Sequence, residues 1–191
     1  MDLKMDLKTD TDKSQYAGLE TIFEDAGFTD YKWIVPEQIV VAQWVRMKCM
    51  FGCPNYGRKG ACPPQTLSVA DCERFFNEYS DAVVFHLRYQ NDDYDERIRW
   101  TRKTAVKLAE LERKVFLAGF EKAYMLLSGG CYICEECAGD RTQCKNPERA
   151  RPAPEGLAVD VFSTVKKLGY PISIRTDTSQ AADRYVFLMV N

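Results

Sequence analysis

The stretch KAYMLLSGGCYICEECAGDRTQC, residues 122–144, joins a predicted strand directly to a loop that holds four cysteines. Its first six residues, KAYMLL, are mainly apolar after Lys122, which is typical of a buried strand. The two glycines that follow let the backbone turn and approach other groups closely. We therefore expect a sheet that carries a cysteine loop at the end of one strand.

Apolar periodicity on both sides of this stretch predicts the remaining elements. Helices are expected at 14–28, 69–79, 95–117 and 157–168. Strands are expected at 30–35, 38–47, 82–89, 122–127, 172–175 and 185–190, the first two forming a hairpin. This order predicts an α+β fold (mixed α/β), with a single mixed sheet, helices packed against it and two cysteine-rich metal-binding loops.

The length and composition fit one domain with a sizeable core, since the chain has 191 residues of which 46% are hydrophobic. The start MDLKMDLKTDTDKS is polar and lacks apolar periodicity. We expect residues 1–13 to form a flexible N-terminal tail and residues 14–191 to form a single metal-binding domain. Its cysteine loops are expected at 49–72 and 131–144.

Charge and hydropathy exclude several classes of protein. The formal net charge of -2 gives no broad basic surface for nucleic acid. No apolar run approaches the ~18 residues of a membrane span, and the acidic start does not resemble a signal peptide. We expect a cytoplasmic protein without nucleic-acid or membrane partners. In that reducing compartment the eight cysteines are expected to be metal ligands or redox groups rather than disulfides.

The second cysteine loop carries the most informative spacing. Cys131, Cys134 and Cys137 form a CxxCxxC motif, and Cys144 follows after six residues. A single zinc ion usually takes two separated CxxC pairs, with each sulfur about 2.3 Å from the metal. A 4Fe-4S cluster has four irons, so its cysteines spread around a larger object that a short turn can wrap. The motif favours a 4Fe-4S cluster, with zinc or redox-active thiols as alternatives.

The first cysteine loop predicts a second 4Fe-4S cluster. Cys49, Cys53 and Cys62 lie in CMFGCPNYGRKGACPP, residues 49–64, and two of them precede proline, as in iron–sulfur loops. Cys72 follows on a predicted helix. It is either the fourth ligand or a small buried helix residue.

His86 is the only histidine of the chain. It lies on the more polar face of the predicted strand 82–89, far in sequence from both cysteine loops. Although imidazole can bind metal or relay protons, we expect His86 to have a structural role.

Three stretches resemble a family of bacterial and archaeal proteins described as predicted metal-binding and cysteine-rich. They are WVRMKCMFGCPNYGRKGACPP (44–64), LERKVFLAGFEKAYMLLSGGCYICEEC (111–137) and CKNPERARPAPEGLAVDVF (144–162). The likeness covers most of the chain from about residue 40. It implies a bound metal with iron–sulfur chemistry, and it implies no established reaction.

The chain departs from the pattern of this family at two positions. Relatives often carry a cysteine just after the RPxxE stretch, where Glu155 is followed here by Gly156, and many lack a cysteine at the position of Cys72. The fourth ligand of the first site is therefore open. Three cysteines would leave one iron accessible to substrate.

These observations predict an iron–sulfur protein with two 4Fe-4S clusters that exchanges electrons with a partner redox protein. An electron carrier is favoured over a catalyst, because no acid or base accompanies the cysteines. The alternatives are a zinc-stabilised protein-binding module and an enzyme or metal-delivery factor with an open iron at the first site. The oligomeric state stays open.

Overall fold

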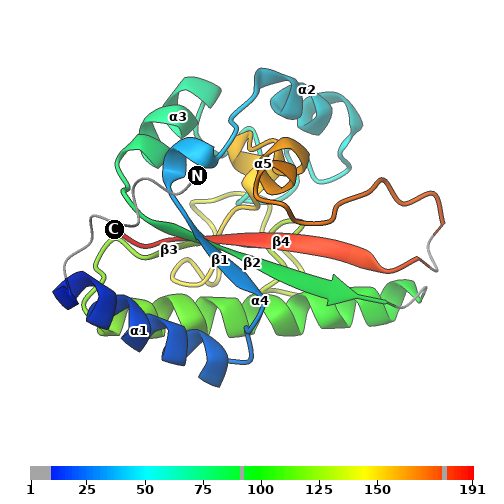
Figure 1. Ribbon diagram of the computed structural model, residues 1–191. Coiled ribbons are helices and arrows are strands. Elements are labelled where there is room, and N and C mark those ends of the chain that lie inside the picture. The colour runs from blue at the N-terminus through cyan, green and yellow to red at the C-terminus, as the bar shows by residue number, and fades with distance from the viewer. Residues whose placement is uncertain (1–9, 91–92, 178–179) are drawn as a thin grey trace.

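The computed structural model describes residues 10–90, 93–177 and 180–191, so residues 1–9 of the expected tail lie outside the described part (Figure 1). Its α-helices are α1 (Asp10–Asp25), α2 (Gln43–Gly52), α3 (Val69–Asn77), α4 (Tyr94–Leu117) and α5 (Val161–Lys167). Short 3-10 helices are η2 (Pro36–Gln38) and η3 (Pro154–Leu157). The strands are β1 (Tyr31–Ile34), β2 (Ala82–Tyr89), β3 (Tyr124–Leu126) and β4 (Ala182–Met189).

The strands form one four-stranded sheet in the order β1-β2-β4-β3, which confirms the α+β class. All three pairings are antiparallel, so the expected mixture of parallel and antiparallel strands is wrong. The sheet is antiparallel because β4, the last strand, runs between β2 and β3, opposite in direction to both.

Helices cover both faces of the sheet, with α1 and α4 on one side and α2, α3 and α5 on the other (Figure 1). Alternation along β2 divides the core, since successive side chains point to opposite faces. Val83 and Phe85 belong to the hydrophobic cluster under α1 and α4, whereas Ala82 and Val84 belong to the cluster that includes α3 and α5. The strand 82–89 and the long helix match their predicted bounds to within one residue.

The predicted strand 38–47 and its hairpin are wrong. After β1 the chain enters η2, which has Pro36 in its first turn, and then forms only an isolated bridge between Val41 and Val159. The helix α2 then begins at Gln43, and β1 pairs with β2 instead. β-branched residues misled the prediction, because their preference for strands depends on packing against neighbouring strands.

Two predictions near the C-terminus also need correction. The residues at 172–175 form no strand in the described structure, and Ile174 is 79% exposed. The predicted helix 157–168 is interrupted, because Ala158 has a left-handed backbone with φ of 60°. Asp160 then caps the shorter helix α5 by accepting a hydrogen bond from the amide of Ser163.

None of the helices in the described part of the chain is long and apolar enough to cross a membrane.

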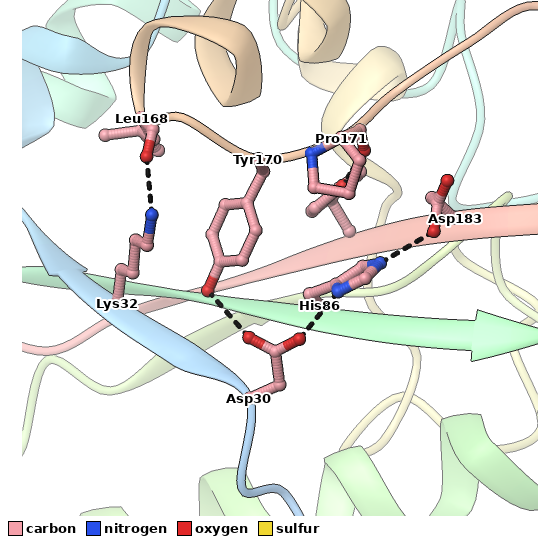
Figure 2. A network of polar contacts seen from close by, with 8 residues as sticks. Asp30, Lys32, His86, Leu168, Tyr170, Pro171 and Asp183 are labelled. Carbon is pink, nitrogen blue, oxygen red and sulfur yellow. Dashed lines mark hydrogen bonds and ion pairs between the residues drawn. The ribbon is translucent and has the colours of Figure 1, made fainter.

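His86 lies on β2 at the centre of a polar network (Figure 2). Its Nδ1 is 2.7 Å from Oδ2 of Asp30, and its Nε2 is 2.9 Å from Oδ1 of Asp183. The imidazole stacks on the ring of Tyr185, and the hydroxyl of Tyr170 donates to Asp30. The network links β2 and β4 to Asp30, the residue before β1, and to the segment after α5, which agrees with a structural role.

Candidate metal centre

The four cysteines of the second loop surround one cavity. Cys131, Cys134, Cys137 and Cys144 all line a cavity of about 230 Å³ next to the first turns of α4. The loop leaves β3 through Leu127, whose amide donates to the carbonyl oxygen of Pro152. The sequence therefore folds so that the four cysteines border a shared space.

Nitrogen donors surround two of these sulfurs. The amide Nδ2 of Asn146 lies 3.0 Å from Sγ of Cys134. Burial raises the pKa of the Cys131 thiol, while the backbone amides of Ile133 and Arg151 hydrogen-bond to its sulfur and lower it. Amides aimed at cysteine sulfur stabilise its negative charge and tune a bound metal.

In the first loop, Cys49, Cys53 and Cys62 lie near one another. Cys49 is in the last turn of α2, and Cys53 caps this helix, its amide donating to the Cys49 carbonyl oxygen. Burial raises the pKa of Cys62 to about 11, Lys59 opposes this rise, and Cys53 and Cys49 add to it. Each of these electrostatic effects requires short separation, so the three thiols form one group.

Cys72 lies apart from that group. It is fully buried on α3, in the hydrophobic cluster with Phe76 and Ala82, and its Sγ is 3.8 Å from the carbonyl oxygen of Leu67. Burial raises its pKa to about 11, Arg46 opposes this rise, and Asp71 and Glu73 add to it. Its role as a fourth ligand stays a prediction.

The two cysteine loops are packed against each other, a contact that the sequence analysis did not foresee. The ammonium of Lys59 donates to the carbonyl oxygen of Cys131 and lies 3.6 Å from the centre of the Tyr132 ring. Gln65 forms two further links, with the Gly139 carbonyl and the Arg141 amide. A negative charge on Cys131 also raises the pKa of Cys62, so one thiol from each loop lies at the contact.

Glycine permits this close approach. Gly130 has φ of 116°, in the region that other residues rarely adopt, and a β-carbon there would lie 3.9 Å from Sγ of Cys62. A β-carbon on Gly60 would lie only 3.0 Å from the backbone of Asp140 and Arg141.

The described cysteines are free thiols without disulfide bonds. Within residues 10–90, 93–177 and 180–191, no group of three or more His, Cys, Asp or Glu side chains is arranged to hold one metal ion. The thiols thus gather in two neighbouring groups without converging on a single point.

The sequence analysis did not identify the contacts that support these cysteines. In the sequence, Asn146 and Arg151 are only neighbours of the second loop. Because amide and guanidinium side chains are common on solvated surfaces, their position alone does not indicate a contact with a cysteine. The roles of Lys59 and Gln65 depend on residues more than 70 positions away. No local pattern could have identified them.

The cysteines lie within a region of the chain that is similar to a known protein family. Neither a curated protein nor a solved structure matches the chain. A family model described as "Predicted metal-binding protein (DUF2284)" matches residues 32–190, which include all eight cysteines. The chain therefore belongs to the DUF2284 family of predicted metal-binding proteins.

Proposed function

We propose that this metal-binding protein holds two 4Fe-4S clusters and exchanges electrons with a partner redox protein. The observation that carries the proposal is the cavity of about 230 Å³ whose wall includes all four cysteines of the second loop. Four thiolates around one space are the ligand set of a cubane cluster.

The size of this space favours a cluster over a zinc ion. A structural zinc site holds four sulfurs about 2.3 Å from the metal, so its ligands converge closely. The cavity that the four cysteines of the second loop line has a volume of about 230 Å³. The four irons of a cubane lie at separate corners, and a wider ring of thiolates suits them.

The surroundings of the sulfurs also suit a cluster. The Asn146 amide and the backbone amides of Ile133 and Arg151 donate to sulfur in the second loop. Such donors, together with burial, set the reduction potential of an iron–sulfur cluster. Lys59 adds a positive charge between the loops, which offsets the negative charge of bound thiolates.

The contact between the loops supports electron transfer. Lys59 and Gln65 tie the two groups of cysteines together, and Cys62 and Cys131 lie at the junction. Two clusters bound there would be neighbours, so one could receive an electron from the other within the same chain. The exposed thiol of Cys53 marks the side of the first group that a partner redox protein could approach.

A second candidate function is favoured by the position of Cys72. Because this thiol is buried in the apolar core, the first cluster would be held by Cys49, Cys53 and Cys62. One iron would then be open to substrate, as in an enzyme or a metal-delivery factor. The carrier and the open-iron protein share the same second cluster.

Anaerobic purification followed by iron, zinc and sulfide analysis tests the proposal. We expect about eight irons and eight sulfides per chain, since each cubane contributes four of each. Electron paramagnetic resonance of the reduced protein should then show two interacting paramagnets, because the loops touch. Protein that contains zinc without iron or sulfide would refute the proposal in favour of a zinc-stabilised module.

A further inference from the structure

A cavity of about 400 Å³ lies beside the cysteine loops, and neither the family description nor the proposed function accounts for it. Its wall combines the start of β4 with the segment before it and the start of α5. Its volume falls in the range of small-molecule sites, about 300–1,000 Å³. The cavity is therefore large enough to hold a small molecule.

Arg184 is the key residue of this cavity. Its side chain lines the cavity, is only partly exposed, and makes no hydrogen bond or ion pair within the described residues. Burial lowers its pKa, and although Glu155 acts in the opposite direction, the positive charges of Arg175 and Arg97 lower it further. A partly buried guanidinium close to two others is stabilised when an anion approaches it.

Arg175 lines the same cavity and adds a second positive charge. The guanidinium of an arginine is planar and presents several N–H donors, which suits the two oxygens of a carboxylate. Two segments of the chain therefore each place one guanidinium group in the cavity wall, where both can bind an anion.

Two carboxylates, Asp183 and Glu155, also line the cavity. Asp183 accepts from Nε2 of His86 at 2.9 Å, so its charge is committed to the histidine network (Figure 2). Glu155 is an exposed residue, so water weakens its attraction to Arg184 and it offsets the charge of that guanidinium only in part.

The remaining wall is largely apolar. Phe162, Ile172 and Ile174 line it together with Tyr185, whose ring stacks on His86. Inorganic phosphate has no part that could bury this surface. An anion with a hydrocarbon portion would contact both the arginine and the apolar wall.

We propose that this cavity binds a small organic carboxylate, with its carboxylate on Arg184 and Arg175 and its hydrocarbon portion against Phe162 and Ile174. The site adjoins the first cysteine loop, because the backbone carbonyl of Glu155 accepts a hydrogen bond from Sγ of Cys49 at 3.8 Å. The inference goes beyond the proposed function and does not depend on which metal the cysteines bind.

Isothermal titration calorimetry of the full chain, purified with its metal, tests the site. The probes are sodium hexanoate, hexanamide and inorganic phosphate at low ionic strength. We expect saturable binding of hexanoate with a dissociation constant on the order of 1 mM, and at least about tenfold weaker binding of hexanamide and phosphate. If hexanoate and hexanamide bound with equal affinity, the site would not recognise the carboxylate charge. If phosphate bound as tightly as hexanoate, the apolar wall would not contribute to binding. Either result would refute the proposal.

Variants locate the binding. Arg184→Gln should weaken hexanoate binding about tenfold or more, whereas Arg113→Gln, on an exposed face of α4, should leave it unchanged. Ile174→Asp provides an independent test, because Ile174 is 79% exposed and the change should not impair folding. Ile174→Asp should weaken hexanoate binding severalfold, because it places a negative charge in the apolar wall. Wild-type affinity in folded Arg184→Gln or in Ile174→Asp would overturn the proposal.

Discussion

Gly60 and Asp140 are packed backbone to backbone, since a β-carbon on Gly60 would lie 3.0 Å from the carbonyl carbon and oxygen of Asp140. This contact joins two loops that are far apart in the sequence. We expect Gly60→Ala to force the loops apart and to lower the free energy of unfolding by about 1–3 kcal/mol, the usual cost of overpacking. Urea denaturation of the purified variant measures this loss.

Gly52→Ala is the matched control for that substitution. A β-carbon on Gly52, at the end of α2, would meet nothing within 4 Å, so this variant should keep wild-type stability. If the two glycine variants unfolded at the same urea concentration, the added β-carbon at position 60 would meet no close neighbour. The packing of Gly60 against Asp140 described above would then be wrong.

The position of Cys72 leads to a second prediction. Because its thiol is buried in the apolar core, we expect Cys72→Ala to keep the iron content of the wild-type protein. Cys62→Ala should lose the iron of the first site, since Cys62 lies with Cys49 and Cys53. Iron and sulfide analysis after anaerobic purification compares the two variants. Loss of about four irons in Cys72→Ala would instead make Cys72 the fourth ligand.

The sequence predicted well what depends on local pattern. The strand 82–89 alternates apolar side chains toward two cores, and the helix at 94–117 repeats them at helical spacing, so both were recognisable. The grouping of Cys131, Cys134 and Cys137 was likewise readable, because short spacing alone keeps these thiols together.

Features that depend on distant contacts could not be predicted. The run at 38–47 is rich in β-branched residues, yet no strand of the described structure pairs with it, and α2 forms in its second half instead. Lys59 reaches Cys131 only because the fold brings the loops together, and Arg184 meets Arg175 only at the wall of a cavity. Such relationships follow from topology, which local periodicity does not encode.

His86 is expected to contribute measurably to stability. Both of its ring nitrogens lie within hydrogen-bonding distance of a carboxylate, Asp30 at Nδ1 and Asp183 at Nε2. His86→Gln keeps at most part of this network, and we expect the free energy of unfolding to fall by roughly 1–3 kcal/mol. Urea denaturation measures the change.

A double-mutant cycle with Asp183→Asn separates the two partners of His86. The Asp183 side chain is 22% exposed, whereas that of Asp30 is 57% exposed. Solvent therefore screens the pair of His86 with Asp30 more strongly. We expect the coupling to Asp183 to exceed that to Asp30. Equal effects of His86→Gln in the wild-type and Asp183→Asn backgrounds would show that this pair contributes nothing.

The ion pair between Arg151 and Glu112 connects the second cysteine loop region to α4. Nε of Arg151 lies 2.9 Å from Oε2 of Glu112, both side chains are largely buried, and Glu112 also accepts from the amide of Met125. Arg151→Met leaves the Glu112 carboxylate buried without its cation. We expect this variant to lose about 3–5 kcal/mol of unfolding free energy, the cost of breaking a buried pair.

The double variant Glu112→Gln with Arg151→Met removes both charges and should be more stable than Arg151→Met alone. Because the side chain introduced by Glu112→Gln is neutral, no unpaired carboxylate remains in the core. Urea denaturation compares the single and double variants, and a double variant no more stable than the single one would contradict the assignment of the cost to the buried charge. The backbone amide of Arg151 also donates to Cys131, so a shift of this segment should alter the metal content of the second loop in Arg151→Met more than in the double variant.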